Sequence, residues 1–453
     1  MSGTVTAGMR RSYAGWQGAA YHQRVRNPFA RFRLATDDAF RNPDIRLLFG
    51  AQGISSLGSQ VSHIAFPLIA IDVIHASNGS IALLEMAFLL PFVLLGIPAG
   101  ALLDRRTRRP VLIATDLART GLLLVVPAAY VTGVLSMPIL LVVLFFVGAC
   151  SLLYDVAHQS YLPAIIRGPQ LAAANGRLMA MESATGVAGP ALAGIAVGRL
   201  TGPIAIVIDS VSFLVSALMV RRVRHVEELP EVTLQKDQTV SIWREMREGA
   251  AWIWQHPHLR GNGLAALIFN FFGGVASSAL MIAYFRRELE LPTELIGIII
   301  GAGTFGLILS TTTNALFVRR FGMGRTLIAG GFLLPSMPLF FAFLDRSMGT
   351  PLIALIAVLT QFVALFGAGL FHVNQVTYRQ LITPSRLLGR MNASMKTLML
   401  LGLPLGAVVG SLIAENFGLR ATLVISALGV LVGPLPLLAS GIARVQVQPE
   451  HSA

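Results

Sequence analysis

Residues 81–133 read IALLEMAFLLPFVLLGIPAGALLDRRTRRPVLIATDLARTGLLLVVPAAYVTG, with an arginine-rich turn between two long apolar runs. A helix of about 20 apolar residues crosses the roughly 30 Å hydrocarbon layer of a membrane. In that layer every backbone N–H and C=O must be paired within its own segment, which a helix achieves. The stretch therefore predicts two membrane-spanning helices joined by a turn.

The same alternation of apolar runs and basic turns continues along the chain. Apolar residues make up 54% of the sequence and charged residues only 13%, about half their usual share in a soluble domain. Hydropathy predicts spans near 46–74, 81–103, 111–133, 137–165, 171–198 and 203–220, and again near 261–285, 293–317, 325–345, 350–379, 388–415 and 420–442. The expected fold class is an all-α membrane protein with twelve transmembrane helices in two six-helix, pseudo-symmetric bundles.

These spans divide the chain into five parts. We expect an N-terminal tail (1–44), an N-terminal bundle (45–221), a linker (222–260), a C-terminal bundle (261–443) and a short C-terminal tail (444–453). The first part is rich in arginine and has no apolar core of the length that a cleavable signal peptide needs. The linker mixes tryptophans with charges, which suits an amphipathic helix lying in the membrane interface or packed under the bundle.

Charge predicts the orientation. If both termini are cytoplasmic, the inside segments hold nearly all the lysines and arginines, as the positive-inside rule requires. We therefore expect a multi-pass protein of the plasma (inner) membrane, surrounded by lipid. The net charge is +13. The basic residues that cause it lie at the ends of spans and do not gather on one soluble surface, so no nucleic-acid partner is expected. We expect a monomer.

Cofactor chemistry has little support in the sequence. Cys150 is the single cysteine, so it lacks the spacing partners of a metal or redox site and of an intramolecular disulfide. No phosphate-binding loop of the Gly-x-x-x-x-Gly-Lys-Ser/Thr type occurs, so this chain is not expected to use ATP. We expect no cofactor, no metal and no enzymatic activity.

The two predicted bundles repeat one another. A shift of about 216 positions aligns identical residues between the fourth and sixth spans of each half. The aligned pairs are Phe146 with Phe362, Gln159 with Gln375, Leu171 with Leu387, Gly194 with Gly410 and Gly202 with Gly418. Duplication across a polar linker is typical of several transporter folds.

The turn after the second span holds the most specific local pattern. It runs Gly100-Ala-Leu-Leu-Asp104-Arg105-Arg106-Thr107-Arg108-Arg109. Glycine allows two helices to approach closely, and a carboxylate with guanidinium groups around it can bond to a facing helix. The turn could be such a latch, or a plain positive-inside turn.

Here the sequence resembles the major facilitator superfamily, whose turn reads Gly-x-x-x-Asp-Arg-x-Gly-Arg-Arg. This chain departs from the motif at Thr107, where a glycine is usual. The resemblance implies that Asp104 and Arg105 lock the cytoplasmic side in the outward-facing state. The equivalent turn of the second half has Val318 where the acid would fall, so the second latch is degenerate.

Shorter pieces resemble one branch of that superfamily, the enterobactin-exporter and macrolide-efflux type. Their order and spacing carry this resemblance over nearly the whole chain after residue 40. The pieces are Ser55-Ser56-Leu57-Gly58, Phe66-Pro67-Leu68, Asp116-Leu-Ala-Arg119, Ala174-Asn175, Asp209-Ser-Val-Ser-Phe213, Arg247-Glu248-Gly249 and His256-Pro257.

Small residues recur in the fifth span. They are Gly186, Gly189, Pro190 and Gly194. They allow close helix packing, and the proline adds a bend. The run also resembles the Gly-Pro motif associated with antiporters of the superfamily, which implies export.

Charges within the spans are the best clue to mechanism, because an ionisable group in hydrocarbon costs several kcal/mol unless it meets water or a partner. Asp116 and Arg119 lie three apart on one helical face and can pair; a substrate or proton contact is the alternative. Each of the remaining carboxylates can be structural or can carry protons. They are Glu85, Asp155, Glu182 and Asp209.

A band of polar residues falls at similar depth in the fourth and tenth spans. These side chains could line a central cavity or only stabilise helix contacts. They are His158, Gln159, His372, Asn374 and Gln375. In span one, His63 is a weaker candidate of the same kind.

The resulting hypothesis is a secondary transporter that exports a small organic molecule, drug-like or siderophore-like, by alternating access with proton antiport. Its partners would be this small-molecule substrate and protons. Two other classes stay open: an importer of a small metabolite, and a membrane scaffold or receptor that transports nothing on the same fold.

Overall fold

The computed structural model describes residues 41–103, 106–166, 169–225, 227 and 242–445. Within them, eleven helices are long and apolar enough to cross a membrane. The last, Leu387–Ser440, has 54 residues. At 1.5 Å per residue it is roughly 80 Å long, and Gly418 breaks it with a φ of 83°. It supplies two crossings, so the described residues contain the twelve predicted spans.

The first six spans form the N-terminal half. Their helices are α3 (Pro43–Leu68), continued by the π-helical turn η1 (Ile69–Val73), α4 (Asn78–Leu103), α5 (Arg108–Val131), α6 (Met137–Ile165), α7 (Pro169–Leu200) and α8 (Gly202–Arg221). Several helices begin with proline in the first turn, where the missing N–H costs no hydrogen bond. In the first, Asn42 also accepts the backbone N–H of Asp44 at 2.9 Å.

The second half has the same order but more interruptions. Its helices are α10 (Pro257–Val275), α11 (Ser278–Ala283) with the π-helical turn η2 (Tyr284–Glu288), α12 (Thr293–Phe321), α13 (Met323–Leu333), α14 (Ser336–Ala342), the 3-10 turn η3 (Arg346–Met348), α15 (Thr350–Ile382), α16 (Ser385–Val432), α17 (Leu435–Ser440) and the 3-10 turn η4 (Ile442–Arg444). The ninth span, predicted as one run, is divided between α13 and α14 near Pro335.

Backbone conformation confirms the internal repeat and extends it to the first span of each half. The π-helical turns η1 and η2 occupy equivalent positions. Each precedes a residue with positive φ, His75 in one half and Glu290 in the other. Gly133 and Gly349 form a second such pair. The two halves therefore share turn geometry as well as helix order.

Pro67, Pro190 and Pro404 all lie within helices. A real break occurs elsewhere, in the seventh span. Ala276 (φ −98°, ψ 53°) and Ser277 (φ −50°, ψ 156°) leave helical geometry between α10 and α11. The Ser277 hydroxyl accepts the N–H of Leu280 at 3.4 Å, so the second part of the span begins as a separately capped helix.

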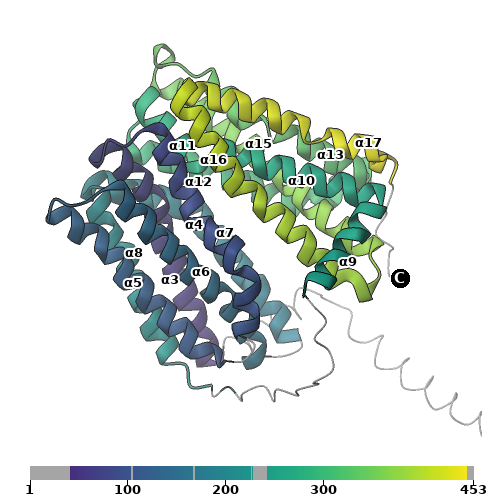
Figure 1. Ribbon diagram of the computed structural model, residues 1–453, viewed down its shortest axis with the longest axis horizontal. Helices are drawn as coiled ribbons and strands as arrows, with labels where there is room; N and C mark the ends of the chain where they lie inside the picture. The colour runs from purple at the N-terminus through teal and green to yellow at the C-terminus, as the bar shows by residue number, and fades with distance from the viewer. Residues whose placement is uncertain (1–40, 104–105, 167–168, 226, 228–241, 446–453) are drawn as a thin grey trace, which may run out of the picture.

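The two halves meet at one end of the molecule. We call the end with the 106–109 turn the basic end and the other the opposite end. Figure 1 shows the two bundles together at the opposite end and diverging towards the end that carries helix α9. The largest buried apolar cluster lies at the opposite end and contains side chains of both halves. The clusters nearer the basic end each belong to one half.

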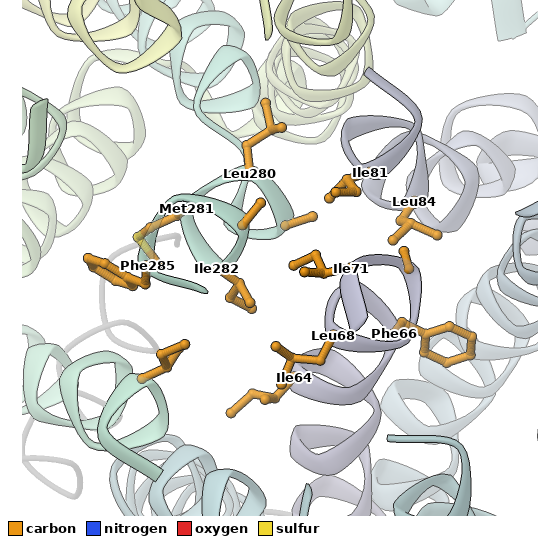
Figure 2. Close-up of a cluster of buried hydrophobic side chains, with 14 of the residues drawn as sticks. Ile64, Phe66, Leu68, Ile71, Ile81, Leu84, Leu280, Met281, Ile282 and Phe285 are labelled. Carbon is orange, nitrogen blue, oxygen red and sulfur yellow. The ribbon is translucent and has the colours of Figure 1, made fainter. Parts of the chain in front are cut away.

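Figure 2 shows this shared core at close range. Ile64, Leu68 and Ile71 from α3 and η1 lie opposite Leu280 and Ile282 from α11. All five side chains are at most 5% exposed. Because these contacts bury apolar surface of both halves, they close the opposite end against water.

Helix α9 (Ile242–Gln255) lies in the predicted linker and belongs to the C-terminal half. Its Ile253 packs against Leu259, Met391 and Met395, and Glu248 forms an ion pair with Arg390. Of the two alternatives for the amphipathic segment, packing beneath the bundle agrees with these contacts.

Candidate substrate pocket and gating contacts

A cavity of about 380 Å³ lies inside the N-terminal half. Helices α3, α4, α6 and α8 form its walls, and α11 of the other half contributes Ser278 and Ala279. Most of the lining is apolar: Phe66, Pro67, Leu84, Phe88, Leu89, Leu144, Val147, Phe213 and Ala279. Pockets for small organic ligands have this size and this apolar majority.

The polar lining comes largely from one face of α3. Ser59, Ser62 and His63 border the cavity, while Ile54 and Leu57 on another face of the helix are exposed. Sequence reasoning missed this stripe apart from His63. The recurrence of Gln52, Ser55, Ser56, Ser59 and Ser62 every three or four positions could have revealed it, because such spacing places residues on one helical face.

Asp209 of α8 is the most buried acid of the cavity and is 2% exposed. Its carboxylate accepts hydrogen bonds from the hydroxyl groups of Ser62 and Ser212, the latter at 3.1 Å. Gly58 makes this arrangement possible, because a side chain there would overlap Ser212. The carboxylate is satisfied within its own half.

Glu85 of α4 borders the same cavity and contacts the other half. Its carboxylate accepts the backbone N–H of Ser278 at 2.9 Å and the Ser278 hydroxyl at 3.0 Å. The Nε2 atom of His63 lies 3.4 Å from that hydroxyl oxygen. Glu85 is thus a cavity acid that links α4 to the broken seventh span.

Asp116 and Arg119 form the ion pair expected from their spacing. The Ser216 hydroxyl donates to Asp116 at 2.7 Å, and the guanidinium carbon of Arg119 lies 4.0 Å from the ring centre of Phe213. Since Phe213 lines the cavity and both charged residues are buried, the pair stands behind the cavity wall. This position fits the structural interpretation of the pair.

Asp155 and Glu182 lie on the N-terminal half, outside that cavity, and both are exposed. Asp155 is within electrostatic range of Glu182 and of Lys396, which α16 of the other half contributes. Asp155 is therefore close enough to sense a cation of the other half.

The polar band on α6 and α15 contains both buried and exposed side chains. His158 is buried and stacks on Tyr154 with ring centres 5.8 Å apart, while Gln159 is exposed. On α15, the Asn374 amide donates to Asn314 at 2.6 Å. Gln375 is buried and lies 3.3 Å from the exposed ring of His372. Only Gln159 and His372 are accessible enough to meet a solute.

At the basic end, Asp104 and Arg105 lie outside the described residues, and Gly100 lies in the last turn of α4. The two later arginines bind the start of the linker. The Glu227 carboxylate accepts the backbone N–H groups of Arg108 and Arg109, and the Arg109 side chain donates to the carbonyl oxygens of Val220 and Arg221. This part of the motif thus joins the start of α5 to the end of α8.

The small residues of span five form the seam between α7 and α12. Gly194 lies against Gly297, and Pro190 against the same glycine. The Thr304 hydroxyl donates to the carbonyl oxygen of Gly186 at 2.9 Å. Gly189 instead faces Gln60 of α3. The expected close packing is present, and it joins the two halves.

A second seam and an ionic clamp complete the closure of the opposite end. The Ser411 hydroxyl of α16 donates to the carbonyl oxygen of Gly79 at 2.8 Å. Arg286 pairs with Asp72 at 3.1 Å, and Arg287 donates to Asn78 at 2.6 Å. Asp72, at the end of span one, therefore holds an arginine of the other half.

Comparison with known proteins agrees with this architecture. The family model described as transmembrane secretion effector matches residues 35–452. The chain belongs to this family of the major facilitator superfamily. It is therefore a multi-pass membrane transporter of that type.

Related sequences are distant. The multidrug efflux pump Tap of Mycolicibacterium fortuitum is 27% identical over 417 residues, which cover 89% of this chain and 95% of Tap. Macrolide efflux protein A of Streptococcus pyogenes is 24% identical over 393 residues, 82% of this chain and 90% of that protein. The alignment with YkuC of Bacillus subtilis, 28% identical, spans 52% of this chain and only 54% of that transporter.

Solved structures share the fold. A bacterial homologue of the iron transporter ferroportin in its inward-facing state matches with a TM-score of 0.66 and 17% identity, over 88% of this chain and 98% of that one. The outward-facing state of the same homologue gives 0.52 at 18% identity, over 88% and 99%. Both comparisons show that this chain shares their fold.

Proposed function

We propose that this transporter exports a small amphipathic organic molecule by alternating access, driven by proton antiport. The observation that carries the proposal is the apolar, aromatic cavity with two acids, placed beside seams that join the halves at one end only. Alternating access requires such a site between ends that close in turn.

The arginine distribution supports a cytoplasmic basic end with both termini inside, so that the described state opens inwards. Two relatives with nearly full coverage are named as efflux proteins, and the Gly-Pro run of α7 resembles an antiporter motif. Together these observations favour export over import. The aromatic lining of Phe66, Phe88 and Phe213 suits drug-like or siderophore-like molecules with apolar rings.

The direct test measures accumulation of a radiolabelled macrolide and of a lipophilic dye in cells that express the chain. We expect lower accumulation than in vector controls, and a protonophore should raise it to the control level. Accumulation above the control would indicate an importer. Equal accumulation in every condition would contradict transport of these probes, and efflux that survives the protonophore would contradict proton antiport.

Variants of the turn motif distinguish a transporter from a scaffold that transports nothing. We expect Asp104→Asn and Arg105→Gln to lower efflux at least tenfold, because the resemblance assigns these residues to gating. Arg106→Gln is the matched control, since Arg106 is an exposed arginine of the same turn and should keep efflux. Surface expression, measured in parallel, must be equal for all three variants.

A further inference from the structure

The break in span seven places the start of a helix inside the seam between the halves. α10 ends at Val275, and Ser278 is the first residue of α11. The first N–H groups of a helix have no partner within it and carry partial positive charge. The Glu85 carboxylate binds there, 2.9 Å from the Ser278 nitrogen. Charge-assisted bonds of this kind are about twice as strong as neutral ones.

Glu85 also faces the cavity, which places it next to any bound solute. Asp209 shares the cavity but bonds to serines of its own half. Two other titratable groups border the cavity with Glu85, His63 from α3 and Asp209 from α8; the lining residues of α6 and α11 are not titratable. On α16, Glu415 bonds to Gly79 at the start of α4. Of the two cavity acids, Glu85 is the one whose bonds must break when the opposite end opens.

We propose that Glu85 couples the cavity to the opposite-end seam and is the proton-binding residue of antiport, an inference that rests on the proposed function. The ionised carboxylate holds α11 against the N-terminal half. A proton that enters the cavity converts it to a neutral acid, a weaker acceptor, and frees Ser278. A substrate that donates a hydrogen bond to Glu85 has the same effect. A carrier with neither ligand stays closed to the outside, so protons do not leak.

The test follows the distance between the halves at the opposite end. Val131 and Phe417 are 83% and 74% exposed on different halves and can carry spin labels in a Cys150→Ala background. Pulsed electron resonance in lipid nanodiscs compares about pH 8 with about pH 4, on either side of the ordinary glutamate value. In the parent protein, acid should increase the long-distance population. In Glu85→Gln that population should be roughly tenfold higher at the alkaline pH and should not respond to acid.

Glu415 provides a matched control. Its carboxylate also accepts a helix-start N–H across the halves, that of Gly79 at 2.8 Å, but it is exposed and lies outside the cavity lining. Glu415→Gln should keep the pH response. His63→Asn should keep it too, because the proposal assigns the proton to Glu85.

Ser278→Pro removes the donors and leaves Glu85 intact. Proline is tolerated at the first position of a helix, and the extended Ser277 before it suits a following proline. This variant should show the same long distances as Glu85→Gln. A normal pH response in Glu85→Gln, or its loss in His63→Asn alone, would overturn the proposal. Because the distances need no transported substrate, their outcome is independent of the efflux assay.

Discussion

Asp116 and Arg119 place two opposite charges inside the N-terminal bundle. Burial of either charge is tolerated only while the two remain paired. The Ser216 hydroxyl binds Asp116, and the rings of Tyr154 and Phe213 flank Arg119, whose guanidinium carbon lies 4.5 Å and 4.0 Å from their centres. Removing one partner leaves an uncompensated buried charge, which costs about 3–5 kcal/mol.

Arg119→Met should therefore lower the free energy of unfolding by about 3–5 kcal/mol. The double variant with Asp116→Leu should recover most of that loss, since no lone charge remains. Thermal unfolding in detergent measures both. Arg286→Gln removes an exposed pair and serves as control, with an expected cost of about 0–1 kcal/mol. Equal losses in the single and double variants would contradict this account.

Sequence spacing predicted the Asp116–Arg119 pair because its residues are three apart on one helix. The same reasoning singled out Glu85 and Asp209 as intramembrane acids. It could not provide the partner of Glu85, because Ser278 lies 193 positions away on the other half. Contacts of that range follow from how the halves pack, which single-helix patterns do not contain.

The helices at the seam between the two halves pack through close approach of their backbones. At the seam between α7 and α12, a Cβ on Gly297 would lie 2.2 Å from the carbonyl oxygen of Pro190. No side-chain rotation can relieve an overlap with backbone, so the two helices would have to separate. The small-residue run predicted in span five therefore packs closely, as expected. The sequence did not indicate that its partner would be α12.

Gly297→Ala should destabilise the protein by about 1–3 kcal/mol, the usual cost of overpacking, and should reduce efflux by loosening the seam. Gly121→Ala is the control, because a Cβ there meets nothing within 4 Å. That change should be neutral or stabilise by up to about 1 kcal/mol. Unfolding temperatures of the two variants in the same detergent decide the matter, and a Gly297→Ala protein as stable as the parent would exclude the proposed overlap.

The break in span seven was not predicted, and hydropathy gave a continuous run over 261–285. Apolar content alone cannot distinguish a continuous helix from two short ones. Polar bonds stabilise the interruption: the Ser277 cap within the segment and the Glu85 carboxylate from α4. By contrast, the break at Gly418 has a local cause, since glycine adopts positive φ without strain.

At the scale of the whole molecule, closure of the opposite end combines one shared apolar core with a polar rim. The core contains residues of both halves, and the Asp72–Arg286 pair lies at its edge with both side chains partly exposed. The internal repeat and the twelve spans were predictable from sequence. Which end of the molecule is closed was not predictable, because the same helices can pack together at either end.

Asp72→Lys should weaken this closure, since two like charges then face each other across the halves. We expect faster labelling of a cysteine placed at Ser278 by a membrane-impermeant thiol reagent added from outside. Adding Arg286→Glu should restore slow labelling by reversing the pair. High salt should shrink the difference, because exposed charges are screened. If the labelling rate is the same in the parent, in Asp72→Lys and in the double variant, the pair takes no part in closure.

The segment between the halves is attached at both ends, by Glu227 to the start of α5 and by Glu248 to Arg390 on α16. Between Glu227 and the first residue of α9, Ile242, the chain can reach at most roughly 50 Å. The halves are therefore held together by their own surfaces and not by peptide continuity. Two co-expressed fragments, separated between residues 228 and 241, should assemble into a working carrier.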